Sequence, residues 1–254
     1  MDRSGSRLVG PVTRGMVTRR HRVPGLAPVE PRQPVGVGMA SERARSRMVD
    51  ALNAAGVKDA DVLAAMNRVP RHQFVEAGLA SRAYEDVALP IGHGQTISRP
   101  STVARMIETV ASRMSAEHRR RAKVLEVGTG CGYQAAVLAE VFGEVISIER
   151  VRHLHENARV NLRPLRLSNL RLVFGDGRLG APSAAPFDAI LLAAAGDEIP
   201  EPLLTQMDIP AVLLAPIQRG ADQALHLVER TDHETWQLTV LDVVRFVPLR
   251  AGTI

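Results

Sequence analysis

The sequence predicts an α/β fold in which helices cover both faces of a doubly wound, mostly parallel sheet. From residue 123 onward, short runs rich in β-branched residues alternate with stretches of helical character, the pattern of parallel strands joined by helices. A glycine-rich segment, 128–132, follows the first of these runs, at a position where such sheets bind ligands. The last two runs, 224–228 and 236–246, have no helical stretch between them and predict an antiparallel pair.

The residues before 115 predict a helical cap on this sheet. In order, they predict a helix from 41 to 55, a helix over 60–67, a loop over 84–98 and a helix from 100 to about 114. Asp59 or Asp61 suits the N-cap of the second helix. Pro100 suits the first turn of the third helix, and Ser98 lies near its N-cap.

The elements of the sheet follow a basic segment, 119–123. Strands are predicted over 124–127, 145–148, 170–174, 189–192 and 212–214, with helices over 133–142, 151–163, near 178 and over 200–207. Strands separated by helical stretches imply a parallel sheet with helices on both faces. We therefore place residues 40–254 in one domain, with the cap and a loop bordering the site in 40–115 and the ligand-binding core in 120–254.

The positive charge of the chain lies in its first 39 residues. The whole chain has a formal net charge of +5, and residues 1–39 contain seven arginines against two acidic residues. Residues 40–254 therefore carry no net charge, and nucleic acid is not needed to explain their composition. We interpret 1–39 as a disordered basic tail. It is either a solvated extension, which we favour, or an anion-binding segment, and Met39 is an alternative start of synthesis.

Composition excludes several classes of protein. The longest apolar runs, 189–195 and 211–217, are far shorter than the roughly 20 residues of a membrane helix. Cys131 is the only cysteine, which excludes an internal disulfide framework and a multi-cysteine zinc site. The chain has no secretory signal pattern, so we expect a cytoplasmic protein. No exposed apolar stripe stands out, so we expect a monomer, and we expect no bound metal.

A glycine loop of sequence GTGCGY covers residues 128–133, and its glycines let the backbone approach a ligand closely. Dinucleotide sites favour the spacing G-x-G-x-x-G, whereas Tyr133 stands here in the place of the third glycine. Glu126, just before the loop, would repel a pyrophosphate but suits the ammonium group of S-adenosylmethionine. We therefore favour this cofactor over a dinucleotide, with a plain tight turn as the alternative. The predicted contacts are Glu126, Gly128, Thr129, Gly130 and Gly132.

Two acidic residues end the next two strands. Glu149 closes the second strand, where a carboxylate accepts hydrogen bonds from both ribose hydroxyls; the alternative is an ion pair with Arg150 or Arg152. Asp176 follows the third strand and suits the adenine amino group, and Gly177 permits a tight turn. The alternative for this pair is an ordinary Asp-Gly turn.

Six segments resemble the protein-L-isoaspartate O-methyltransferases, in the same order, between about residues 41 and 250. They are 68–71, 88–98, 124–133, 175–177, 186–190 and 244–249. The sequence GQTIS at 94–98 is the most specific of them. Two stretches depart from the family pattern: 208–211, where a Gly-Gly turn is usual, and 216–218, where Pro-Val-Gly is usual.

The resemblance implies a Rossmann-like fold of the S-adenosylmethionine-dependent methyltransferase type. It also implies methyl transfer to the free α-carboxylate of L-isoaspartyl residues in damaged proteins and peptides. The resulting ester closes to a succinimide, which hydrolyses partly to normal aspartate. Since the carboxylate is already ionised and the sulfonium already activated, neither a general base nor a metal is needed.

The resemblance also assigns residues to this chemistry. It implies that Ser98 orients the substrate carboxylate, although spacing alone favours a plain helix cap for this serine. It implies that Gln95, Thr96 and Ile97 line the cofactor, and Gln223 is assigned to the cofactor site as well.

Two other classes of protein remain as alternatives. The first is a methyltransferase of the same fold that acts on RNA or on a small molecule. Residues 191–196, after the fourth strand, lack the amide and the aromatic ring of a base-stacking motif. The second is a nucleotide-dependent oxidoreductase or a non-catalytic binding module. The glycine spacing argues against it, as does the lack of a Tyr/Lys or His acid pair near the sheet edge.

Overall fold

The computed structural model describes residues 38–254. The basic tail predicted from the sequence lies outside these residues, apart from its last two. None of the described helices is long and apolar enough to cross a membrane.

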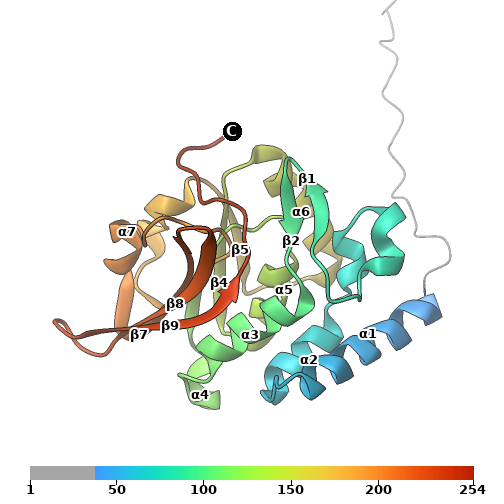
Figure 1. Cartoon of the computed structure of the whole chain (residues 1–254), viewed down its shortest axis with the longest axis horizontal. Coiled ribbons are helices and arrows are strands. Elements are labelled where there is room, and N and C mark those ends of the chain that lie inside the picture. The colour runs from blue at the N-terminus through green and yellow to red at the C-terminus, as the bar shows by residue number, and fades with distance from the viewer. Residues whose placement is uncertain (1–37) are drawn as a thin grey trace, which may run out of the picture. The chain divides into compact units, whose positions relative to one another are not determined.

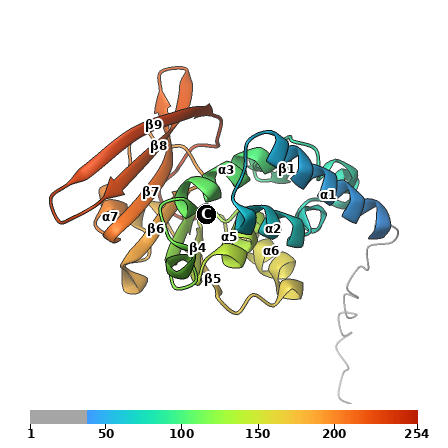
Figure 2. The ribbon, with the colours of Figure 1, turned by 90° about the horizontal axis from the view of Figure 1, so that it is seen from below.

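The helical cap contains the three helices that the sequence predicts and several shorter turns. Its elements are α1 (Gly38–Ala54), α2 (Ala60–Arg68), the 3-10 turns η1 (Arg71–Phe74) and η2 (Ala77–Arg82), α3 (Pro100–Ala111) and α4 (Ala116–Arg119). Asp59 caps α2, because its Oδ1 accepts the N–H groups of Asp61 and Val62, each at 3.1 Å. α4 lies just before the basic segment, where no helix was predicted, and shares only Arg119 with it. Figure 2 shows α1 and α2 packed beside each other, near α3.

The core is a seven-stranded sheet with the order β5-β4-β3-β6-β7-β8-β9 (Figure 1). The strands are β3 (Lys123–Val127), β4 (Glu144–Glu149), β5 (Leu170–Phe174), β6 (Phe187–Leu192), β7 (Met207–Arg219), β8 (Asp222–Arg230) and β9 (Trp236–Val244). β3 to β7 are parallel, and β8 and β9 are antiparallel to their neighbours. The predicted α/β fold is confirmed, including its antiparallel C-terminal strands.

The connections between the strands are helices and short turns. They are α5 (Tyr133–Val141), α6 (Arg152–Leu162), η3 (Arg163–Leu165), η4 (Gly177–Leu179), η5 (Pro182–Ala184) and α7 (Glu201–Leu204). The stretch near 178 is therefore a 3-10 turn, and the helix predicted over 200–207 is a single turn. β7 is much longer than the predicted 212–214, since Met207 already pairs with Phe187. The departure from the family pattern at 208–211 thus lies inside a strand.

The stretch 84–98, predicted as a loop, contains a β-hairpin. β1 (Leu89–Gly92) and β2 (Gln95–Ile97) pair antiparallel, with Leu89 opposite Ile97. The turn between them is made by Gly92, His93 and Gly94, all with positive φ. These strands are too short, and too interrupted by proline and glycine, to show a period in the sequence. At the tip of the hairpin, the His93 ring lies 5.1 Å from that of His153 in α6.

The first turn of α3 is capped by a residue other than the predicted Ser98. The N-cap position is Arg99, whose side chain makes no capping hydrogen bond. Asp86 supplies the cap instead: its Oδ1 accepts the N–H of Ser101 at 2.8 Å, and its Oδ2 accepts the Ser101 hydroxyl at 2.8 Å. Ser98 lies two residues before the start of α3 and does not cap it.

Apolar side chains form two clusters, one on each face of the sheet. The larger cluster joins cap residues such as Met66 and Ile107 to α5, and to sheet residues such as Val124. The smaller cluster covers the opposite face and includes Leu125 and Leu213. The larger cluster also includes Leu89 and Ile97, so the hairpin that follows η2 is held against the cap and the sheet.

One face of β9 is apolar and exposed, which the sequence did not reveal. Trp236, Leu238 and Val240 alternate along the strand and are 41%, 57% and 57% exposed. The register with β8 shifts between Ala224 and His226. This β-bulge places Val243, 74% exposed, on the same face.

Candidate active site

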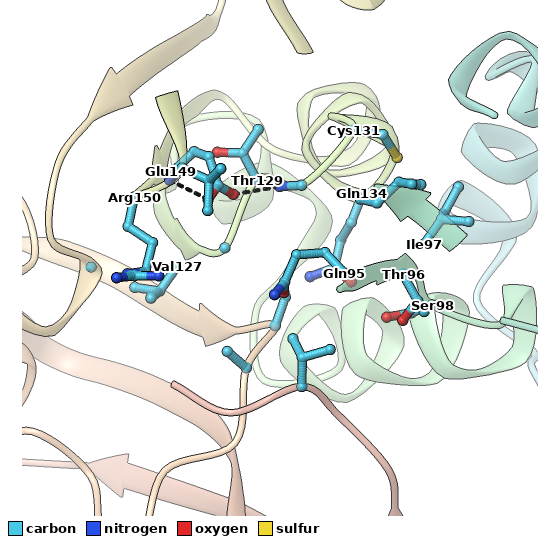
Figure 3. A pocket seen from close by; sticks show the side chains of 18 of the residues that line it. Gln95, Thr96, Ile97, Ser98, Val127, Thr129, Cys131, Gln134, Glu149 and Arg150 are labelled. Carbon is cyan, nitrogen blue, oxygen red and sulfur yellow. Dashed lines mark hydrogen bonds between the residues drawn. The ribbon is translucent and has the colours of Figure 1, made fainter. Parts of the chain in front are cut away.

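A pocket opens where the carboxyl ends of β3, β4 and β6 face the hairpin (Figure 3). Together with the open space at its mouth it measures about 870 Å³. Of the residues predicted from the sequence, nine line it: Gln95, Thr96, Ile97, Ser98, Gly128, Thr129, Gly130, Glu149 and Gly177. The structure thus brings together residues spread over more than eighty positions of the chain.

The glycine loop forms the floor of the pocket. Gly130 has a φ of +56°, which side chains rarely adopt, and its N–H points to Glu149. Gly132, with a φ of +93°, is the N-cap of α5 and does not line the pocket. A Cβ at Gly132 would lie 2.8 Å from the Leu162 side chain, so this glycine allows α5 and α6 to pack closely.

Glu149 is buried at the edge of the pocket, only 5% exposed. Its Oε2 accepts the N–H of Gly130 at 2.8 Å, and its Oε1 accepts the N–H of Val151 at 2.9 Å (Figure 3). Among the described residues it forms no ion pair with Arg150 or Arg152, the alternative considered from the sequence. Each carboxylate oxygen keeps a free lone pair, so both can still accept a ligand hydroxyl.

Glu126 lies behind the glycine loop and does not line the pocket. It is fully buried and accepts a hydrogen bond from the Ser147 hydroxyl, which is also 2.6 Å from the Thr129 hydroxyl. Burial raises the pKa of Glu126 to about 8, although the Ser147 hydrogen bond acts in the opposite direction. The side chain is therefore mostly protonated at neutral pH, and its predicted contact with an ammonium group stays a prediction.

Asp176 and Gln223 also lie outside the pocket lining, but both hold the C-terminal segment that forms one wall. Asp176 accepts the N–H of Gly252 at 2.6 Å. Gln223 accepts the N–H of Phe246 at 2.6 Å and donates to its carbonyl at 3.1 Å. Their predicted contacts with the cofactor stay predictions.

The hairpin forms the opposite wall. Ile91 lies so close to the glycine loop that a Cβ on Gly130 would be 3.2 Å from its Cδ1. Gln95, Thr96 and Ile97 line the pocket along the hairpin, and Ser98 follows at its end (Figure 3). Within the described part of the chain, the Ser98 hydroxyl forms no hydrogen bond, so it is available to a ligand.

Several lining residues were missed by the sequence analysis. They are Ile91, Val103, Val127, Cys131, Tyr133, Gln134, Ile148, Arg150, Val151, Ala193, Ala194 and 247–250. Gln134 follows the glycine loop in the first turn of α5, a position that could have drawn attention to it. It is 7% exposed, and neither atom of its amide has a hydrogen-bond partner in the described structure.

The pocket suits S-adenosylmethionine better than a dinucleotide. The buried amide of Gln134, whose proximity to the Glu126 carboxyl acts to lower the pKa of that group, has no hydrogen-bond partner by distance and angle in the described structure and offers both a donor and an acceptor, as the amino-acid end of this cofactor requires. Glu149 offers acceptors for ribose hydroxyls, which both cofactors carry, whereas the loop lacks the third glycine of the dinucleotide spacing. In the described residues, no group of three or more His, Cys, Asp or Glu side chains could hold a metal ion.

Comparison with known proteins points the same way. The model of the family described as protein-L-isoaspartate(D-aspartate) O-methyltransferase matches residues 43–253. The protein-L-isoaspartate O-methyltransferase of Ralstonia nicotianae is 56% identical over 229 residues, which cover 85% of this chain and 71% of the relative. The protein of the same name from Burkholderia lata is 58% identical over 218 residues, with coverages of 85% and 69%.

Solved structures agree on the fold. The structure of a protein-L-isoaspartate O-methyltransferase that is 29% identical has a TM-score of 0.71. The superposition covers 80% of this chain and 65% of that chain. A second, from Plasmodium falciparum and solved with S-adenosyl-L-homocysteine, has a TM-score of 0.71 at 24% identity, with coverages of 81% and 98%.

The fold and the pocket therefore define an S-adenosylmethionine-dependent methyltransferase of the α/β class. The family match spans nearly all of the described residues, and close relatives carry the same name. The chain belongs to the protein-L-isoaspartate(D-aspartate) O-methyltransferase family.

Proposed function

We propose that this chain transfers the methyl group of S-adenosylmethionine to the free α-carboxylate of L-isoaspartyl residues in proteins and peptides. The ester then closes to a succinimide, which begins repair. The observation that carries this proposal is the placement of Ser98. This residue lines the pocket directly after three pocket-lining residues of the hairpin. Its hydroxyl has no hydrogen-bond partner in the described chain.

The cofactor supplies a methyl group that is activated by its sulfonium. We assign its ribose to Glu149, and the amino-acid end to the glycine loop and Gln134. We assign its adenine to the backbone around Gly177. Asp176 and Gln223 contribute by holding the C-terminal wall, and Glu126 by supporting the loop through Ser147.

Ser98 suits a substrate that must stay nucleophilic. A carboxylate with an ordinary pKa is ionised at neutral pH, so no base has to remove a proton. A neutral hydroxyl orients one oxygen by a single hydrogen bond without neutralising the charge, as a full ion pair would. What remains is alignment of the two reactants, which contributes up to about 7–11 kcal/mol in favourable cases.

The test is methyl transfer from labelled S-adenosylmethionine to two synthetic peptides that differ only in one linkage, aspartyl or isoaspartyl. We expect label in the isoaspartyl peptide alone. Equal labelling of both peptides, or labelling of neither, would contradict the proposal.

The same reaction with total RNA in place of the peptides tests the alternative of an RNA methyltransferase, which was considered from the sequence. Label in the RNA would support that alternative. Against that alternative, the residues after β6 that line the pocket are Ala193 and Ala194, which cannot stack on or hydrogen-bond to a base through their side chains.

The expectations of a cytoplasmic location and of a monomer remain proposals of ours. A free, buried cysteine supports a reducing compartment. The exposed apolar face of β9 is the surface on which a second copy would pack, so light scattering of the wild type beside Leu238→Lys tests the expected monomer. Equal masses at the monomer value would support the monomer, and a dimer lost in the variant would contradict it.

A further inference from the structure

Ser98 lies between β2 and α3, and its side chain is not held by a hydrogen bond to another described residue. It follows the hairpin and precedes the N-cap of α3, while its hydroxyl has no partner in the described structure. Its position in the pocket therefore depends on how the first turn of α3 is held. The side chain that holds this turn is Asp86, which lies 15 positions before the residue it binds.

Asp86 binds the start of α3 with both oxygens. One accepts the N–H of Ser101 and the other accepts the Ser101 hydroxyl, both at 2.8 Å. A carboxylate at a helix N-terminus satisfies donors that have no partner within the helix and is favoured by the helix dipole. Because Asp86 already occupies this place, the helix end is not open to a second carboxylate.

The turn that carries Asp86 is itself held by a buried arginine. Arg71 is 0% exposed. Its Nε donates to the carbonyl of Ala83 at 2.7 Å, and its Nη2 donates to that of Val87 at 3.3 Å. These two carbonyls lie on either side of Asp86. The same guanidinium lies 4.9 Å from the ring centre of Tyr133, which lines the pocket. A continuous set of contacts thus runs from the pocket floor through Arg71 and Asp86 to the helix beside Ser98.

We propose that Asp86 is a positioning residue for methyl transfer: by capping α3 from outside the helix, it fixes Ser98 at the pocket and leaves the Ser98 hydroxyl free for the substrate carboxylate. This inference rests on the proposed function. A cap that merely stabilised α3 would act on stability alone, whereas a positioning residue acts on the reaction of the peptide.

The variants Asp86→Ala and Asp86→Asn separate these two roles. Alanine removes both acceptors. Asparagine can still accept the Ser101 N–H through its oxygen, and its amide can donate to the Ser101 hydroxyl. The control is Asp59→Ala, which removes the cap of α2 and, unlike Asp86→Ala, also an ion pair, with Arg119 at 2.7 Å. Each variant is measured for kcat and KM on an isoaspartyl peptide, for Kd of S-adenosylhomocysteine and for thermal unfolding.

We expect Asp86→Ala to lower kcat/KM for the peptide by about 100-fold, as misplacement of a reacting group by about 1 Å can do. Kd for S-adenosylhomocysteine should stay within about 3-fold, because Asp86 does not line the pocket. Asp86→Asn should recover most of the activity, and Asp59→Ala should lose thermal stability while keeping kcat. Ser101→Ala keeps the hydrogen bond from the backbone N–H of residue 101 to Asp86 and loses the one from the hydroxyl, so its kcat/KM should fall several-fold. It stands in for Asp86→Ala if that variant does not bind S-adenosylhomocysteine.

Three results would overturn the inference. The first is full peptide activity in Asp86→Ala or, if that variant is unfolded, in Ser101→Ala. The second is a loss of kcat in Asp59→Ala as large as in Asp86→Ala, which would indicate general destabilisation. The third is an Asp86→Asn variant as poor as Asp86→Ala, which would indicate that charge matters and geometry does not. A wild type that ignores isoaspartyl peptides would instead defeat the proposed function.

Discussion

The carboxylate of Glu149 accepts the N–H of Gly130 at 2.8 Å, and its other oxygen accepts the N–H that begins α6, at Val151. One side chain thus ties the glycine loop of the first strand to the end of the second. The loop conformation and the predicted ribose contact depend on the same two oxygens. We therefore expect cofactor binding and local stability to be coupled at this residue.

Glu149→Gln should weaken cofactor binding. A glutamine has one acceptor where the carboxylate has two, so one of the two backbone N–H groups loses its partner in a buried place, which costs about 1–3 kcal/mol. We expect Kd for S-adenosylhomocysteine to rise at least about 10-fold, measured by calorimetry. The matched control is Glu144→Gln at the other, exposed end of β4, which should change nothing. Equal affinities in wild type and Glu149→Gln would contradict the assignment.

Ser98→Ala should lose activity without losing stability. Because the hydroxyl makes no hydrogen bond in the described chain, its removal costs the fold little. The loss of one hydrogen bond to an anionic substrate should lower kcat/KM by about 10- to 100-fold. Ser112→Ala, at the far end of α3, removes a hydroxyl that bonds the Thr109 carbonyl, and it serves as the control in a radiolabel-transfer assay. Wild-type activity in Ser98→Ala would remove the central residue of the proposal.

The fold could be predicted because its signals are local. Alternating apolar runs and helical stretches indicate the parallel core, and the glycine loop indicates the ligand edge. Asp59 could be predicted as a helix cap because it stands next to the helix it caps. Asp86 could not, since it caps a helix from 15 positions away, and no short-range pattern reveals this.

The C-terminal wall of the pocket was missed for the same reason. The carbonyl of Val247 accepts the N–H of Ala195 at 2.8 Å, and the N–H of Leu249 donates to the Ala195 carbonyl at 2.7 Å. This pairing joins residues more than fifty positions apart and is set by tertiary packing. Glu126 is a different case. Its position just before the loop could be predicted, but only the structure shows that its side chain is buried in the core and not in the pocket lining.

Glu126→Gln should change how stability depends on pH. Burial raises the pKa of Glu126 from 4.5 in the unfolded chain to about 8 in the fold. Well below pH 4.5 the carboxyl is protonated in both the folded and the unfolded state, so it does not lower the free energy of unfolding. As the pH rises toward 8, the unfolded state ionises and the folded state does not, so the wild type loses stability, by an amount on the order of a few kcal/mol.

The glutamine variant lacks this loss, because its side chain is neutral at every pH. The free energy of unfolding of Glu126→Gln, relative to wild type, should therefore grow as the pH rises from about 5 to about 8. Urea titrations at the two pH values measure it. A difference that is constant with pH would mean that Glu126 is ionised in the folded protein, and the ammonium contact predicted from the sequence would regain support.

Cys131 should be dispensable for the reaction, although it lines the pocket. Burial raises the pKa of its thiol to about 11, so only about one molecule in a thousand carries a thiolate at pH 8. A thiol in this state is a poor nucleophile, and methyl transfer to a carboxylate requires no covalent intermediate. We expect Cys131→Ala to keep kcat within about 3-fold and the wild-type thiol to react slowly with iodoacetamide at pH 8. Loss of more than about 100-fold in kcat, together with rapid alkylation that S-adenosylhomocysteine prevents, would instead make Cys131 a participant in the chemistry.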